Sequence, residues 1–286
     1  MCERVTMTPR GVRWEARQIA ALWRPYLVFA RLRYPGTVVG PGTELVIDGF
    51  TRSGVTFALF AFQMAQPRPV PTAHHTHAAS HVIEAVRRRV PTVLVVRDPE
   101  ETVLSTMIRE PYVTPSAALR AYRRFHGRLQ PHRDRLLVTR FESVMSDLGS
   151  VIRDLNARFG TAFEPFLHTA DNAAQVFRLI EDRSGRPPWA GALGRLENGE
   201  IGVAEYERAV ASAGGRAALA PPPEHRVPRP SPERQAMKTR LRDRVRAEAD
   251  LLRAARAAYS AMVPSIDVPA DMPPDVASLG EENNSL

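Results

Sequence analysis

A thirteen-residue stretch, LVIDGFTRSGVTF at positions 45–57, constrains the fold more than any other part of the chain. Leu45–Asp48 is mostly apolar and predicts a short buried strand, which ends at Gly49. A small polar turn follows, and an apolar run that begins at Val55 predicts a helix over 55–66. The first N–H groups of a helix have no internal partner and lie at the positive end of the helix dipole. The stretch therefore predicts a cradle for a phosphate or sulfate group.

Two further apolar runs, at 92–96 and 136–140, also predict buried strands. Helical patterns lie between and after the strands, at 55–66, 79–89, 99–109, 115–130 and 143–159. The last helix should end at Gly160, because glycine is favoured just beyond a helix terminus. Strands that alternate with helices indicate a parallel sheet with right-handed crossovers. We therefore expect an α/β fold, with three α/β/α layers around a central, mainly parallel sheet.

A second candidate anion site follows the strand at 92–96. Asp98 is a good N-cap, Pro99 suits the first helical position and Glu101 completes a capping-box pattern. Arg97 therefore lies at the carboxyl end of a parallel strand, where open α/β sheets bind ligands. Ser105 lies roughly 10 Å along the helix, so its hydroxyl and the long Arg97 side chain can meet on one phosphate. The alternative is an ordinary helix in which Arg97 pairs with Glu101.

The composition favours one large domain and an anionic partner. A chain of 286 residues with 44% hydrophobic content can bury the core of a large α/β domain with appendages. The net charge of +8 and the isoelectric point near 10.4 favour anionic ligands. Lys238 is the only lysine among the 39 basic residues. Because this chain uses arginine so freely, any single arginine is weak evidence for a site.

Cysteine content and hydropathy bear on the compartment. The single cysteine, Cys2, excludes an internal disulfide and a Cys-based zinc site, and it fits a cytoplasmic protein. No run approaches 18 apolar residues, so we expect no transmembrane span. The apolar run Ile19–Ala30 is interrupted by Arg24 and Pro25 and lacks a small-residue cleavage pattern, which argues against a signal peptide.

Residues 1–40 predict a basic N-terminal helical extension. Aromatic residues are interleaved with arginines of this segment, among them Arg10, Arg13, Arg17, Arg24, Arg31 and Arg33. One or two amphipathic helices that pack on the outside of the domain explain this pattern. A face for peripheral membrane contact or partner binding is the alternative.

The predicted main domain spans 41–262. Its segment 183–235 is rich in Pro and Gly and predicts loops that close over a substrate or connect elements, with a short helix at 203–213. A long helix is predicted over 232–262, with Ser231 as its N-cap. Residues 263–286 carry several acids and no basic residue, which predicts a disordered acidic tail.

The two candidate anion sites together resemble the sulfotransferase superfamily, whose members use 3′-phosphoadenosine 5′-phosphosulfate (PAPS) as sulfuryl donor. The family's first motif is Lys or Arg, then Ser, Gly, a variable residue and Ser or Thr, and here it reads Arg52-Ser53-Gly54-Val55-Thr56, followed by Phe57. The second motif is an Arg and a Ser eight positions apart, as Arg97 and Ser105 are here. The stretch 138–144, VTRFESV, is similar to a third landmark, a strand that leads into Y-E-D-L. The resemblance covers about 43–160.

This resemblance implies a P-loop-like sulfotransferase fold, a PAPS site without a metal, and transfer to a hydroxyl or amine of a carbohydrate or small-molecule acceptor. Arg52 to Phe57 would surround the 5′-phosphosulfate, with Arg52 also stabilising the leaving group, and Arg97 and Ser105 would hold the 3′-phosphate. The family's usual C-terminal loop over the 3′-phosphate is not visible, and Arg229 or Arg226 is the candidate replacement. Neither the acceptor nor the oligomeric state follows from the sequence.

The candidate base lies in a histidine-rich stretch, where four of the eight histidines fall within 74–81. Many sulfotransferases carry K-T-H between the first two motifs, and His75-Thr76-His77 occupies that place, so His77 is the first choice. His75 and Glu84 are the alternatives. A metal site of His75, His77 and His81 is disfavoured, because no Cys or carboxylate lies close in the sequence.

Two other functions fit parts of the sequence. A P-loop kinase or NTPase would explain the spacing of Gly49 and Gly54 and the hydroxyl of Thr56, but Val55 stands where the phosphate-bridging lysine belongs. A non-catalytic basic binding protein would explain the arginine-rich helical face Arg120, Arg123, Arg124 and Arg128. We expect the sulfotransferase and no nucleic-acid partner.

Overall fold

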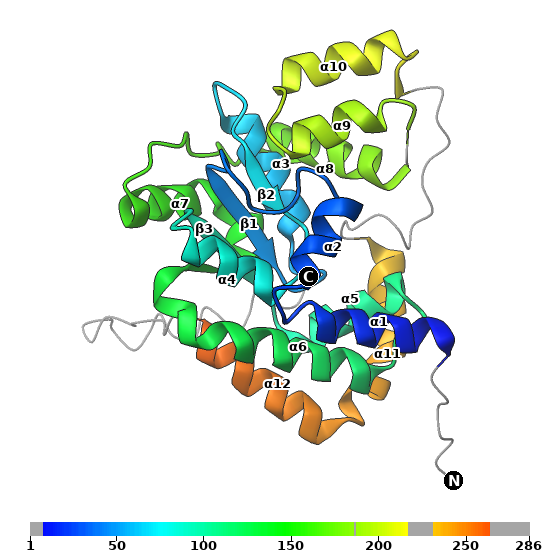
Figure 1. The fold of residues 1–286 in the computed structure, drawn as a ribbon. Helices are drawn as coiled ribbons and strands as arrows, with labels where there is room; N and C mark the ends of the chain where they lie inside the picture. Colours follow the sequence, from blue (N-terminus) through cyan, green and yellow to red (C-terminus); the bar gives the residue numbers. More distant parts are fainter. Residues whose placement is uncertain (1–7, 186, 217–230, 264–286) are drawn as a thin grey trace, which may run out of the picture.

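The computed structural model describes residues 8–185, 187–216 and 231–263. In this part of the chain a parallel sheet has the strand order β2-β1-β3-β4 (Figure 1). The strands are β1 (Leu45–Gly49), β2 (Thr72–His74), β3 (Thr92–Val96) and β4 (Leu137–Arg140). Ile47 of β1 pairs with His74 on one side and with Val93 on the other. The three predicted strands are confirmed, and β2 is an addition that three residues were too few to reveal by periodicity.

Helices connect and cover these strands. In chain order they are α1 (Pro9–Ala20), α2 (Tyr26–Arg33), α3 (Val55–Ala65), α4 (Ala79–Arg87), α5 (Pro99–Arg109), α6 (Pro115–Leu129), the 3₁₀ helix η1 (Gln130–Arg135), α7 (Phe141–Phe159), α8 (Ala170–Gly185), α9 (Ala190–Glu197), α10 (Val203–Ser212), α11 (Pro232–Arg246) and α12 (Ala249–Met262). The five helices predicted between residues 55 and 159 are confirmed. Gly160 caps α7 in the left-handed region, with φ 67°.

Alternating strand residues supply two cores, one on each face of the sheet. Val93 and Val95 belong to a cluster with α3, α7, α8, α9 and α10. Leu94 and Val96 belong to a second cluster with α4, α5, α6 and α12. Because successive side chains of a strand point to opposite faces, this alternation puts helices on both sides of the sheet. The predicted three-layer α/β/α fold is confirmed.

The loop predicted for 183–235 is largely wrong where the structure describes it. The helix expected at 203–213 is present as α10, but α8 extends to Gly185 and α9 follows at once. Leu193 and Leu196 of α9 are buried in the first core, and this packing stabilises a helix that contains two glycines. Tertiary contacts therefore override the weak local propensity.

The long helix predicted over 232–262 is two helices. Ser231 caps α11 as predicted, accepting a hydrogen bond from the Arg234 N–H. The chain turns at Ala247 and Glu248, where Glu248 leaves the helical region with ψ 49°. The two helices have different partners, since α11 packs on α5 and α12 packs mainly on α6 (Figure 1). Because the chain bends between them, α11 can pack on α5 while α12 packs on α6.

No helix in the described ranges combines the length and apolar character needed to cross a membrane. The acidic tail predicted for 263–286 lies outside the described residues except for Val263, which is buried.

Candidate active site

The turn between β1 and α3 is shaped by backbone conformations that few residues adopt. Arg52 has φ 68° and Gly54 has φ 95°. Glycine is favoured at position 54 for two reasons. Its φ is positive, and a Cβ there would lie 2.7 Å from the ring of Phe141. Such left-handed turns gather backbone N–H groups into an anion-binding concavity. The first N–H groups of α3 lie beyond this turn without a side-chain cap.

A hydroxyl in the same turn lacks a partner. Ser53 is 2% exposed, and its Oγ has no hydrogen-bond partner among the described residues. A buried, unpaired hydroxyl costs free energy unless a ligand satisfies it. Ser53 therefore indicates that a polar ligand group belongs in this turn.

Arg97 extends from the end of β3 toward the turn. It donates from Nη1 to the Arg52 carbonyl at 3.2 Å, and its guanidinium lies 4.0 Å from the centre of the Phe141 ring. The suspected pairing with Glu101 is present only as a long ion pair of 3.7 Å. Asp98 caps α5, as the sequence predicted, by accepting from the Glu101 N–H. These contacts brace Arg97 beside the turn.

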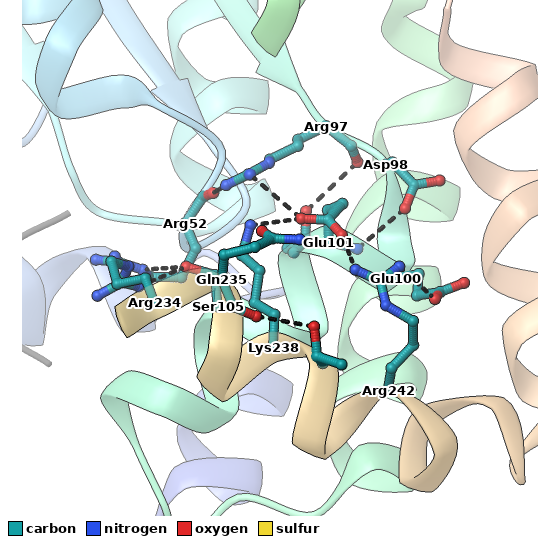
Figure 2. A network of polar contacts seen from close by, with 12 residues as sticks. Arg52, Arg97, Asp98, Glu100, Glu101, Ser105, Arg234, Gln235, Lys238 and Arg242 are labelled. Atoms are coloured by element: carbon teal, nitrogen blue, oxygen red, sulfur yellow. Dashed lines mark hydrogen bonds and ion pairs between the residues drawn. The ribbon is translucent and has the colours of Figure 1, made fainter. Parts of the chain in front are cut away.

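Ser105 is the point at which two arginines meet (Figure 2). Arg52 donates from Nε to the Ser105 Oγ at 3.1 Å, and Arg234 donates from Nη2 to the same oxygen at 3.3 Å. Arg234 lies in the first turn of α11 and is 5% exposed. The second anion site therefore adjoins the first, and the C-terminal helices contribute to it.

Ion pairs hold α11 against α5 (Figure 2). Glu101 pairs with Lys238 at 2.5 Å and with Arg242 at 2.9 Å. Glu100, which is 4% exposed, pairs with three arginines, Arg242, Arg246 and Arg256, at 2.8 to 3.0 Å. This clamp positions Arg234 next to Ser105.

The site carries excess positive charge. Burial, and then the charges of Arg234, Arg109, Arg97 and Arg183, lower the pKa of Arg52 to about 9. Like charges held this close destabilise one another, and a bound anion removes that cost. The electrostatics therefore point to a polyanionic ligand.

The hydrogen bonds of His77 fix its tautomer. Its Nδ1 lies 2.9 Å from the Gly49 carbonyl oxygen, which can only accept, so Nδ1 carries the proton. Asp48 lies 3.5 Å from the same nitrogen. Nε2 is then the basic nitrogen, and it has no hydrogen-bond partner among the described residues. His77 is thus prepared to accept a proton through Nε2.

Asp48 organises the segment that carries His77. Its buried carboxylate accepts hydrogen bonds from the Gly49 N–H, Thr76 Oγ1, the His77 N–H and His81 Nδ1. Burial by itself raises the pKa of Asp48, but the hydrogen bonds to His77 and His81 outweigh it and hold the pKa well below the usual value. Asp48 therefore stays ionised at neutral pH and anchors both histidines.

A second chain of hydrogen bonds ends on Thr56. The Asn198 amide donates to Glu200, so its oxygen accepts from His74 Nε2. His74 Nδ1 then accepts from His75 Nδ1 at 2.8 Å, and His75 Nε2 accepts from the Thr56 hydroxyl at 2.9 Å. Burial and the charge of Arg183 lower the pKa of His75 well below its usual value, and that of His74 falls to about 3, so both rings are neutral.

These groups line one cavity of about 800 Å³. The candidate residues Arg52, Ser53, Gly54, Val55, Thr56, Phe57, His77, Arg97 and Ser105 all lie on its wall. The wall also includes residues of α11, namely Arg234, Gln235 and Lys238, and the apolar residues Phe141, Met145, Phe177 and Ile180. Arg183 is part of the same wall and forms an ion pair with Glu197.

Other candidates lie elsewhere. Arg229 and Arg226 fall outside the described residues. Glu84, the alternative base, pairs with Arg24 and Arg88 and is not part of the cavity wall. Within the described ranges no three His, Cys, Asp or Glu side chains are placed to hold a metal ion.

The arginine-rich face of α6 is partly covered. Arg120 and Arg124 pair with Glu15 of α1, and Arg128 lies over the ring of Trp23. Three of the four arginines that supported nucleic-acid binding therefore contact the N-terminal segment, and Arg123 is exposed.

Sequence reasoning missed Arg234. The signal available was the N-cap pattern at Ser231, which places Arg234 in the first turn of a helix. Nothing local showed that this turn reaches Ser105, which is 129 residues away in the sequence.

Comparison with known proteins yields one structural match. No family model matches the chain, and no curated protein matches it in sequence. Among solved structures, mouse sulfotransferase SULT7A1 complexed with PAP aligns with 10% sequence identity over 82% of this chain and 95% of that chain, with a TM-score of 0.39. A structural similarity at this level carries no weight for function, and the evidence for a function lies in the residues that line the cavity.

Proposed function

We propose that this chain is a sulfotransferase that uses PAPS as donor and transfers the sulfuryl group to a hydroxyl of a small-molecule acceptor. The observation that carries this proposal is the composition of a single cavity. Its wall combines two adjoining candidate anion-binding sites, a histidine with a basic Nε2 and several apolar side chains.

The polar end fits a nucleotide with two separate anionic groups. The turn from Arg52 to Thr56 offers backbone N–H groups and the unpaired Ser53 hydroxyl to a phosphosulfate. Ser105, with Arg234 bonded to its hydroxyl and Arg97 on the same cavity wall, suits a second phosphate. The volume of about 800 Å³ lies within the usual range for small-molecule sites.

The kinase alternative fits less well. Val55 stands where a P-loop nucleotide enzyme needs lysine. The described wall of the cavity includes no Asp or Glu, and Mg²⁺ at nucleotide phosphates usually takes one or two carboxylate ligands. Arginine and backbone N–H groups supply the positive charge instead.

The chemistry assigned to the chain's own residues is positioning, charge stabilisation and proton transfer. Bound PAPS would supply the sulfuryl group. The acceptor hydroxyl gives its proton to His77 Nε2 as its oxygen bonds to sulfur. The electron pair of the broken S–O bond stays with the departing phosphate oxygen, whose charge Arg52 and the N–H groups of α3 stabilise.

The apolar side chains of the wall favour an acceptor with an apolar body. Phe57, Met145, Phe177 and Ile180 present no polar side-chain group except the weakly accepting Met sulfur. An apolar ring packed on these side chains buries surface at about 25 cal/mol per Å². A phenol or an alicyclic alcohol buries its ring and exposes one hydroxyl to His77.

Thermal shift with 3′-phosphoadenosine 5′-phosphate (PAP) tests the donor site. PAP without magnesium at 100 times its Kd should stabilise the protein by about 2.7 kcal/mol, whereas ATP with Mg²⁺ should have little effect. Arg97→Ala should abolish most of the shift, and Arg87→Ala, a change of the same type at an exposed position of α4, should preserve it. Stabilisation by ATP with Mg²⁺ alone, or by neither nucleotide, would refute the proposal.

A further inference from the structure

Exposed apolar side chains of the described chain are concentrated in its first two helices. Seven large apolar residues are exposed, and only Leu167 lies outside this region. The other six are Val12, Ile19, Trp23, Val28, Phe29 and Leu32, with exposed fractions from 42% to 82%. Large exposed apolar side chains gathered in one short segment of the chain indicate an interaction site.

On α1 the exposed apolar residues form an outward stripe. Val12, Ala16, Ile19 and Ala20 recur at helical spacing, and all are exposed. Trp23, also exposed, lies in the turn between α1 and α2. The opposite side of α1 packs inward through Gly11 and Trp14. The helix thus turns an apolar face to its core and a second apolar stripe to the outside.

On α2 the outward residues are also apolar. Tyr26, Leu27 and Ala30 are buried, while Val28, Phe29 and Leu32 are exposed. Arg31 and Arg33 are exposed on the same helix. The outer side of α2 therefore combines large apolar side chains with arginine.

The charge of the same segment indicates what covers it. Residues 9–33 contain six arginines, and Glu15 is the only acid. Glu15 is already paired with two arginines of α6, so it does not offset the positive charge of the outer face. Arg10 and Arg13 are exposed on α1. An apolar stripe with Trp and Phe, flanked by arginine, is typical of helices that lie in the interface of an anionic membrane.

Arg24 is paired with Glu84, and Arg17 and Arg31 make hydrogen bonds within the protein. We propose that the outer face of residues 9–33, made of the six exposed apolar residues and the exposed arginines Arg10, Arg13 and Arg33, docks on an anionic lipid bilayer. The apolar side chains enter the boundary between headgroups and acyl chains, and the arginines pair with lipid phosphates and carboxylates. This attachment is peripheral and independent of the chemistry proposed for the cavity.

Vesicle co-sedimentation of the full chain tests this. Phosphatidylcholine vesicles containing phosphatidylserine should bind the protein, pure phosphatidylcholine should bind it far less, and added salt should weaken binding. Leu32→Ser or Ile19→Ser should lower the partition coefficient roughly tenfold through lost apolar burial. Arg13→Gln should lower it about fivefold. Leu167→Ser, which changes an equally exposed leucine elsewhere, should have no effect.

Three outcomes would overturn the proposal. The first is no binding to either vesicle. The second is equal loss in Leu167→Ser and Leu32→Ser. The third combines two results: the protein self-associates in gel filtration in a concentration-dependent way that Leu32→Ser abolishes, and vesicles do not bind it. The outer face would then be a contact between copies of the chain. PAP-induced stabilisation, measured on the same variants, should be unchanged and shows that they are folded.

Discussion

Neutralising Arg234 should weaken PAP binding, and it removes one of the positive charges that lower the pKa of Arg52. Arg52 Nε and Arg234 Nη2 lie 3.1 and 3.3 Å from one Ser105 oxygen. Two unit charges about 6 Å apart repel by about 3 kcal/mol at an effective dielectric constant of about 20. Burial, and then the charge of Arg234, lower the pKa of Arg52 in the folded protein. A cation whose pKa falls on folding makes folding less favourable at neutral pH.

Arg234→Gln removes the charge and keeps an amide that can still donate to Ser105. A charge-assisted hydrogen bond contributes about 1.5–3 kcal/mol, so the Kd of PAP should rise by about 10- to 150-fold. Isothermal titration without magnesium measures this, and thermal unfolding of the ligand-free variant measures the relief of repulsion. Arg240→Gln, on the exposed side of the same helix, changes the net charge equally and should leave the Kd within about twofold.

Two results would refute this reasoning. An unchanged Kd would mean that Arg234 does not contact the ligand. A Kd raised equally by Arg234→Gln and Arg240→Gln would mean that the loss follows net charge and not the position of Arg234.

Three further predictions concern the base, its anchor and the clamp on α11. His77→Ala should lower turnover of PAPS and 2-naphthol by about 10²- to 10⁴-fold with an unchanged Kd for PAP, and His75→Ala should lower it less; the reverse order would assign the base to His75. The ionised form of Asp48 is favoured by folding, so its contribution to stability is present above about pH 4 and is lost as the pH falls further. Unfolding temperatures measured against pH should show this decline in the wild type, and Asp48→Asn should be less stable at neutral pH and less sensitive to acid. Glu100→Gln should cost about 3 kcal/mol in chemical denaturation and weaken PAP binding, whereas the exposed Glu233→Gln should do neither.

The sequence predicted the sheet and the anion-binding turn because both depend on local signals. Apolar runs end at Gly49 and Val96, and an N-cap at Asp98 marks where the next helix begins. Such patterns place Arg52 and Arg97 at the same sheet edge before any coordinates are known, since carboxyl ends of neighbouring parallel strands lie together.

The parts that the sequence did not predict depend on contacts between distant segments. Arg234 reaches Ser105 only because Glu100 and Glu101 pair with basic residues one to three turns further along α11. The helix α9 forms because its leucines fill a core shared with α3 and α8. No window of local sequence contains that information.

Three residues around the cavity hold backbone conformations that side chains resist. Arg52, His75 and His77 have φ of 68°, 53° and 50°, and strain of this kind costs about 1–3 kcal/mol for each residue. Glycine at these positions would relax the backbone and remove the groups that bind and react. A library of variants selected for heat resistance alone should therefore accumulate glycine at these three positions and lose transferase activity as it does so. Selection for stability and selection for turnover therefore favour different residues at these three positions.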